Sequence, residues 1–63
     1  MEMIVKHDNK DLFIVHISMD ITWALVTYDK EKLSGIFKID MDNLNFNKKQ
    51  SAYISKINSE SFK

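Results

Sequence analysis

The sequence predicts an α+β domain in which a four-stranded antiparallel β-meander is followed by a short C-terminal helix. Three observations support this fold class. Residues 1–40 are rich in Val, Ile, Phe, Trp and Thr, the residue types that favour strands. Polar clusters at residues 8–10 and 29–32 separate the apolar runs, as turns do. After residue 42 the apolar residues recur at helical spacing instead.

The size of the chain limits how its fold can be stabilised. With 63 residues it forms a single domain over residues 1–63, and such a domain buries only about 60% of the surface that its unfolded chain exposes. A hydrophobic fraction of 44% with 29% charged residues is typical of a folded chain. There is no cysteine, so neither disulfides nor a Cys-based zinc site can help. We therefore expect very good packing or association with a partner chain.

Neither a membrane span nor a secretory signal is visible in the sequence. The uncharged stretch at residues 21–28 is too short to cross a bilayer. The first six residues contain no basic segment followed by an apolar one. We therefore expect a cytoplasmic protein that does not act on a membrane.

The four strands are expected over residues 3–7, 11–18, 21–28 and 34–40. Side chains alternate between the faces of a strand, so the turn lengths decide which residues share a face. Three-residue turns at residues 8–10 and 18–20, with a five-residue connection over 29–33, give the most consistent pattern. They place one apolar set on a single face, which we expect to be the core: Met3, Val5, Phe13, Val15, Ile17, Ile21, Trp23, Leu25, Phe37 and Ile39. One long strand over residues 11–28, bent near Asp20, is the alternative, although it exceeds the usual strand length.

The same register leaves a second apolar face, formed by Ile4, Leu12, Ile14, Ala24, Val26 and Ile36. One short helix covers only one face of a sheet, and an exposed apolar patch usually marks an interface. The sequence therefore predicts a small non-enzymatic protein-binding or regulatory module that forms a homodimer or docks on a larger protein. The predicted interface residues are Ile14, His16, Val26, Tyr28 and Ile36. Two arrangements would remove the patch, because residues 41–63 could fold over it or a curled barrel could turn it inward.

A helix is expected over residues 48–58. Asn47 and Gln50 have the spacing of a capping box, and Tyr53, Ile54 and Ile57 follow at helical spacing. Asn58 would close the helix and leave residues 59–63 as a frayed tail. If residues 52–57 formed a fifth strand instead, the chain would resemble a small SH3-like β-barrel.

The neutral total charge conceals an uneven distribution, which indicates a second possible function. Residues 48–63 carry four lysines and one glutamate, so an acidic first part is followed by a basic tail. Lys48, Lys49 and Lys56 could bind nucleic acid in this alternative. The chain has no arginine, which argues against the bidentate readout of guanine used in sequence-specific DNA binding.

No residue pattern indicates catalysis, a cofactor or a metal. His7 and His16 are predicted on opposite faces of the sheet, and residues 40–51 depart from a calcium-binding loop at the positions that matter most. The single glycine excludes a Gly-rich phosphate loop. A substrate-sized pocket would hollow so small a core, so we expect neither an enzyme nor a small-molecule substrate. The small size and the lack of catalytic groups are consistent with a phage or mobile-element protein that inhibits a host factor.

Overall fold

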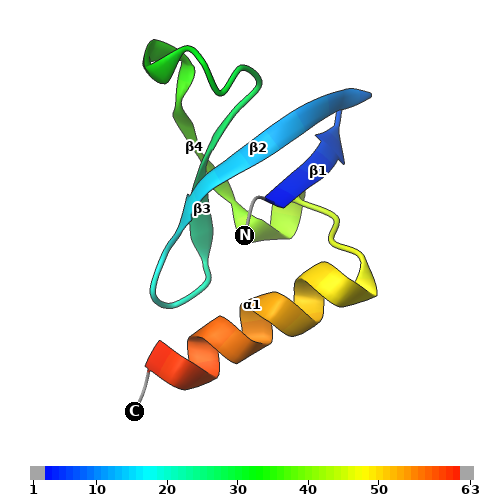
Figure 1. Ribbon diagram of the computed structural model, residues 1–63, viewed down its shortest axis with the longest axis vertical. Helices are drawn as coiled ribbons and strands as arrows, with labels where there is room; N and C mark the ends of the chain where they lie inside the picture. The colour runs from blue at the N-terminus through cyan, green and yellow to red at the C-terminus, as the bar shows by residue number, and fades with distance from the viewer. Residues whose placement is uncertain (1–2, 62–63) are drawn as a thin grey trace.

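The computed structural model describes residues 3–61 and has the predicted fold class. An open antiparallel sheet is formed by β1 (Met3–His7), β2 (Lys10–Ile17), β3 (Trp23–Thr27) and β4 (Phe37–Asp40), in that order. One helix, α1 (Lys48–Ser61), follows near the C-terminus and lies below the sheet in Figure 1. Short 3₁₀ turns at Leu33–Gly35 and Met41–Asn43 flank β4. Because residues 52–57 belong to α1, the five-stranded barrel is excluded, and the chain reversal between β2 and β3 excludes a single strand over residues 11–28.

The first turn is shorter than predicted, and this changes the faces of the sheet. Asp8 and Asn9 have φ angles of 52° and 64°, which is the pattern of a two-residue type I′ turn. Val5 therefore pairs with Leu12 and not with Phe13. A slip of one residue reverses every side chain of a strand, so the predicted register of β1 on β2 is wrong.

The two other strand pairings also differ from the prediction. The chain turns over residues 18–22, and a β-bulge between Ile14 and His16 shifts the register of β2 on β3. On the next pair, Leu25 lies opposite Lys38 and not opposite Phe37. As a result, the predicted core set is divided between the two faces of the sheet.

The core lies on the face that was expected to be exposed. Leu12 and Val26 are completely buried, and Phe13, Trp23 and Leu25 are only half-buried on the other side. Of the six residues predicted on the exposed face, only Ile4 remains largely accessible. We call the buried side the core face; it carries Met3, Val5, Leu12, Ile14, Ala24, Val26 and Ile39. We call the opposite side the open face; it carries Ile4, Phe13, Trp23, Leu25 and Lys38.

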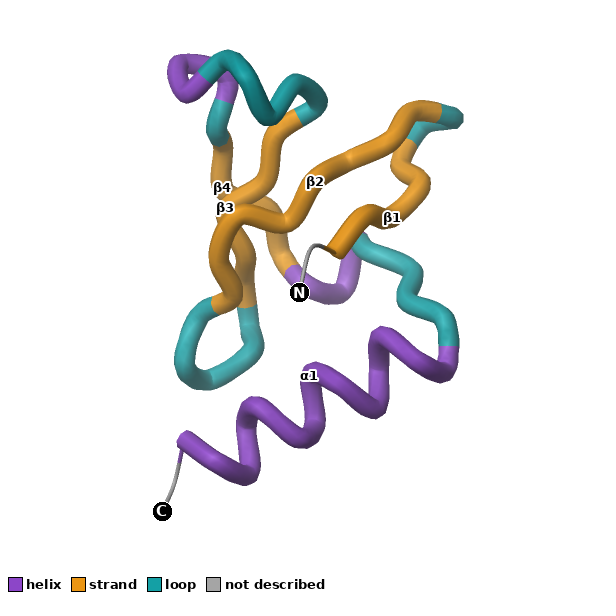
Figure 2. The backbone as a smooth tube through the Cα atoms, viewed as in Figure 1, coloured by secondary structure: helices purple, strands orange, loops and turns teal. Residues whose placement is uncertain are grey.

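The chain after β4 covers the core face. Met41, Leu44 and Phe46 pack against the buried residues of the sheet. Figure 2 shows the corresponding loop passing from β4 to the start of α1. Of the two arrangements that would cover this face, the structure therefore shows the one in which the chain after β4 folds over it, through residues 41–46.

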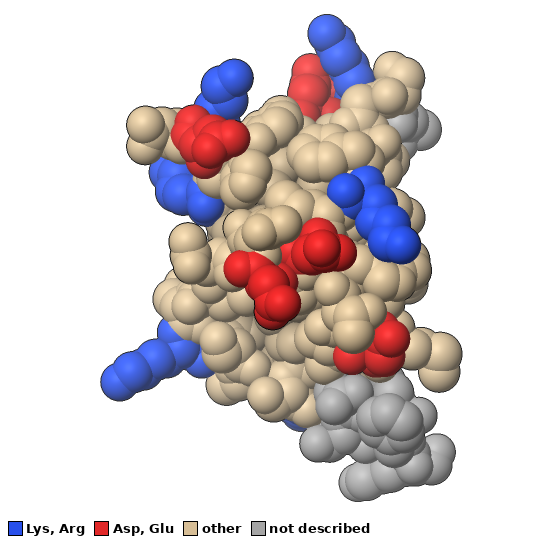
Figure 3. Space-filling model, turned by 180° about the vertical axis from the view of Figure 1, so that it is seen from behind, with Lys and Arg blue, Asp and Glu red and all other residues tan. Residues whose placement is uncertain are grey.

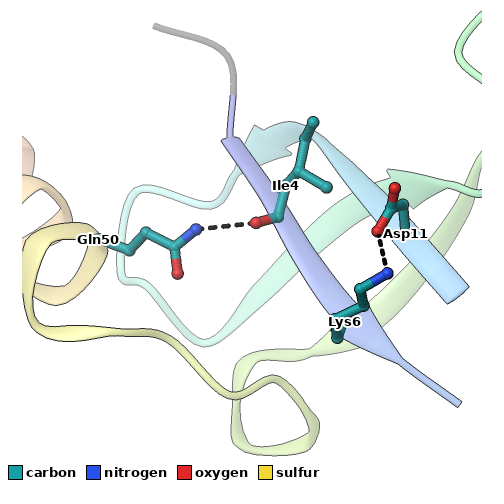
Figure 4. Close-up of polar contacts among 4 residues, drawn as sticks. All are labelled: Ile4, Lys6, Asp11 and Gln50. Carbon is teal, nitrogen blue, oxygen red and sulfur yellow. Dashed lines mark hydrogen bonds and ion pairs between the residues drawn. The ribbon is translucent and has the colours of Figure 1, made fainter. Parts of the chain in front are cut away.

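The predicted capping box starts α1. The backbone N–H of Gln50 donates to Asn47 Oδ1 at 2.8 Å, and the backbone N–H of Asn47 donates to Gln50 Oε1 at 3.0 Å. Gln50 Nε2 also donates to the Ile4 carbonyl at 2.8 Å, which ties the helix to β1 (Figure 4). The helix continues past Asn58 to Ser61, so its predicted end is wrong; residues 62–63 of the predicted tail lie outside the described residues.

Candidate docking groove

An apolar groove lies between α1 and the end of β2 with its following loop. Its volume is about 420 Å³. In Figures 1 and 2 the β2–β3 loop descends beside the C-terminal half of α1, where the groove is found. The lining residues are mostly aliphatic: Met3, Ile14, Val15, His16, Ile17, Ser18, Met19, Ile21, Tyr53, Ile54 and Ile57. We call this site the groove.

The groove has a buried floor and an apolar rim. Ile54 is buried where α1 meets the sheet, and Ile14 and Ile17 are half-buried beside it. Around the opening, Met19 is 77% exposed, Val15 51% and Ile57 38%. Single exposed apolar residues are ordinary, but a cluster around a concavity is the arrangement found at docking sites.

Hydrogen bonds hold the β2–β3 loop in one conformation. The Ser18 hydroxyl donates to Asp20 at 2.8 Å and accepts from the backbone N–H groups of Thr22 and Trp23. The Thr22 hydroxyl donates to the same Asp20 oxygen at 2.7 Å. The hydrogen bond from Thr22, followed by that from Ser18, lowers the pKa of Asp20 below its ordinary value of 3.8.

The loop also contains a strained residue. Ile21 has a φ angle of 58°, in the left-handed region that β-branched residues rarely occupy. Its backbone N–H donates to the Ser18 carbonyl at 3.0 Å, and its side chain lines the groove. Strain of this kind costs about 1–3 kcal/mol and persists where the surrounding contacts enforce it. The loop thus presents Met19 and Ile21 in a fixed arrangement.

The helical wall of the groove is flanked by positive charge. Tyr53, Ile54 and Ile57 form this wall. Lys49 and Lys56 lie four residues before and three residues after Tyr53, so they are its neighbours on the helix surface. Both lysines are exposed. The groove therefore has an acidic loop on one side and a basic helix on the other.

The predicted interface residues do not form one surface. Ile14 and His16 line the groove, but Val26 is completely buried in the core and is not available to a partner. Tyr28 lies at another end of the core face, where its hydroxyl is 2.8 Å from His7 Nδ1 and its ring packs on Phe37. Ile36 is half-buried next to β4. The register error explains this dispersal, because it exchanged the two faces.

Sequence reasoning missed the residues that define the groove. The sequence predicts Met19 in a turn and Ile57 at helical spacing with Tyr53 and Ile54, and neither pattern indicates a groove. Their proximity depends on how α1 lies against β2, for which the sequence carries no direct signal. The only sequence clue was an apolar Met and Ile in a loop where Gly, Asn or Asp is usual.

Lysines and aromatic rings lie together on the open face. Lys38 Nζ is 4.8 Å from the centre of the Trp23 ring, and Lys30 Nζ is 5.4 Å from that of Phe13. The His16 ring lies 6.0 Å from the Trp23 ring. These contacts are within cation–π range and cover the aromatic rings with lysine side chains.

Neither a cluster of metal ligands nor a membrane-spanning helix is found among the described residues. Within residues 3–61 no three His, Asp or Glu side chains come together as metal ligands would. His7 and His16 pair with Lys10 and Leu25, respectively, and lie on opposite faces. Among the helices of this part of the chain, none combines the length and the apolar character that a membrane crossing needs.

Comparison of the chain with known protein families, with characterised proteins and with solved structures finds no match.

Proposed function

We propose that this chain is a non-enzymatic protein-binding module whose groove receives an apolar side chain from a protein partner. The observation that carries the proposal is the apolar rim around the groove, with Met19 77% exposed. Apolar surface gains roughly 25 cal/mol per Å² when it leaves water, so a partner side chain seated here would stabilise a complex. Such a module acts by occupying a partner's surface, as a regulatory subunit or an inhibitor does.

The polar groups of the groove favour a protein side chain over a polar small molecule. Small-molecule sites use a few well-placed polar groups to orient their ligand. Here the Ser18 hydroxyl is engaged by Asp20, Thr22 and Trp23 within its own loop. The His16 ring packs on Trp23. The remaining lining is aliphatic or aromatic apart from the Tyr53 hydroxyl.

Nucleic-acid binding is the second candidate, and the lysine–aromatic contacts of the open face favour it. Bases stack on exposed aromatic rings while lysines contact phosphates. However, Lys48, Lys49 and Lys56 are on α1, which lies below the sheet in Figure 1, whereas the rings are on the open face of the sheet. Asp40 lies directly opposite Trp23. On the side shown in Figure 3, acidic side chains lie between the lysines and would repel a phosphate backbone.

Peptide selection tests the proposed function. A library of random peptides displayed on phage is panned against the full chain, and binding of selected peptides is measured by fluorescence polarisation. We expect peptides with apolar anchor residues and Kd values of about 1–100 µM. Ile57→Glu at the groove should weaken binding at least tenfold, roughly the effect of losing one buried side chain.

Ile4→Glu is the matched control, because Ile4 is 40% exposed, like Ile57 at 38%, but lies on the open face. The control should bind the peptides as the unaltered chain does. The proposal would be contradicted if Ile57→Glu and Ile4→Glu weakened peptide binding equally, or if the selection enriched no peptides at all. Salt-dependent binding of a labelled oligonucleotide at about 150 mM salt would support the second candidate instead.

A further inference from the structure

We propose that the occupant of the groove is the Met19 side chain of a second copy of this chain, so that two copies form a two-fold symmetric dimer. This inference rests on the proposed function and names its partner. Met19 and the groove are on the same side of each molecule, because Met19 is part of the groove's rim. In a two-fold dimer each copy can therefore supply one Met19 and one groove at the same time.

Met19 has the properties of an anchor residue. At 77% exposure it is the most exposed large hydrophobic side chain among those described. Its loop is fixed by the hydrogen bonds among Ser18, Asp20 and Thr22, so little conformational entropy remains to be lost on binding. The methionine side chain is itself flexible and fits irregular apolar cavities. A rigid loop that carries an adaptable apolar side chain suits insertion into the groove.

The charges beside Met19 and beside the groove are complementary. Asp20 follows Met19 directly, and its lowered pKa keeps it ionised at neutral pH. Lys49 and Lys56 flank Tyr53 on the helical wall. When Met19 of one copy enters the groove of the other, Asp20 is brought toward these lysines. The same pairing occurs twice in the dimer, which favours this partner over one without an acidic group beside its apolar residue.

A dimer interface would use a modest part of the surface of each copy. A stable interface buries about 800 Å² per partner, which is about one sixth of the 4866 Å² accessible surface of this chain. Few side chains are fully buried within one copy, the largest being Leu12, Val26 and Thr27. Domains of this size commonly gain stability by oligomerisation. Covering the rim residues Val15, Met19 and Ile57 would add apolar burial that the single copy lacks.

Sedimentation equilibrium of the full chain from about 5 µM to about 1 mM tests the dimer. We expect a concentration-dependent mass that approaches twice the 7.4 kDa of one chain. Met19→Glu should weaken the dimer at least about 100-fold, because two contacts are lost together. Met19→Leu should leave it nearly unchanged. A chain that stays monomeric at about 1 mM, or a dimer that tolerates Met19→Glu, overturns the inference.

A mixing experiment tests whether the contact is reciprocal. Met19→Glu changes one rim position but leaves the floor and the helical wall of the groove unaltered, and Ile57→Lys keeps Met19 intact. A mixed pair has one contact of Met19 with an unaltered helical wall and one in which Glu and Lys face each other, so it should associate more tightly than either variant does alone. Absence of such rescue, with both variants folded by circular dichroism, contradicts the exchange. Val15→Lys replaces Ile57→Lys if that variant does not fold, because Val15 also lines the groove.

Charge variants test the orientation of the two copies. Lys56→Glu should weaken the dimer several-fold and make it less sensitive to salt. Lys48→Glu is the control; its side chain is displaced from the groove side of α1, so its effect should be small. Equal effects of the two variants would contradict the pairing with Asp20. If the chain is monomeric but selected peptides still bind the groove, the second copy is excluded and the protein-binding function remains.

Discussion

Val26 and Val15 provide a direct test of which side chains form the core. Val26 is completely buried between Ile14 of β2 and Phe37 of β4, whereas Val15 is 51% exposed at the rim of the groove. The same substitution, Val→Ala, can be made at both positions, and both lie in the sheet, so the loss of strand propensity is similar.

The expected magnitudes follow from the burial. Removing two carbon atoms from Val26 forfeits about 1.6 kcal/mol of transfer free energy at roughly 0.8 kcal/mol per buried group, and the cavity left behind adds to this. We expect a total loss of about 2–3 kcal/mol. A domain of this size has a free energy of unfolding of about 3–9 kcal/mol, so the effect is large. Val15→Ala should cost less than about 1 kcal/mol, because half of its side chain is already in water.

Urea unfolding followed by circular dichroism measures both losses. The protein is kept at a few micromolar, where association of two copies contributes little. From the two urea midpoints, the free energy of unfolding of the Val15→Ala variant should exceed that of the Val26→Ala variant by at least about 1 kcal/mol. If Val15→Ala is as destabilising as Val26→Ala, Val15 is not an exposed rim residue and the groove does not exist as described.

Substitutions at three further positions test the turns and the helix cap. Asn47→Ala should destabilise the domain by about 1 kcal/mol and Asn47→Ser by much less, since Ser can still accept the hydrogen bond of the cap; thermal unfolding measures both. Asn9→Val should cost about 1–3 kcal/mol in urea, because a β-branched residue is strained at the φ of 64°, and Asn9→Gly should cost nothing. Asp20→Asn should be less stable than the unaltered chain at pH 7. The lowered pKa of Asp20 contributes stability above pH 3.8 that is lost as the pH falls below that value, so the two proteins should converge in acid-unfolding curves. If the difference in stability between the Asp20→Asn variant and the unaltered chain stays constant down to about pH 2, this role of Asp20 is contradicted.

The sequence predicted the elements of the fold well where the signal was local. The capping box of Asn47 and Gln50 identifies the first residue of α1, since both hydrogen bonds involve residues three positions apart. Strand-forming residues and polar turns located β1 to β4 to within a few residues. The end of α1 was missed because Asn58 does not stop the helix and the serines that follow it are accommodated.

The register could not be predicted from alternation alone. Both parities of β1 to β3 carry apolar residues, so a pattern of apolar and polar positions does not distinguish the faces. The register of β1 on β2 is therefore determined by the turn at Asp8 and Asn9, two residue types that tolerate a positive φ. A two-residue turn consists of Asp8 and Asn9. A three-residue turn would include Lys10 as well, so β2 would begin one residue later. The twist of a type I′ turn matches that of the flanking strands, which favours the shorter turn.

The β-bulge in β2 determines which side chain of this strand joins the core face beside the groove. In a regular strand, Leu12, Ile14 and His16 would share the core face, and the His16 side chain would lie under α1. The bulge between Ile14 and His16 instead places His16 opposite Leu25 and Ile17 opposite Ala24. Ala24 is buried in the core, so Ile17 joins the core face, while His16 moves to the ring of Trp23 on the open face. The insertion of one residue thus exchanges a titratable side chain for an aliphatic one on the core side of β2, where the groove begins.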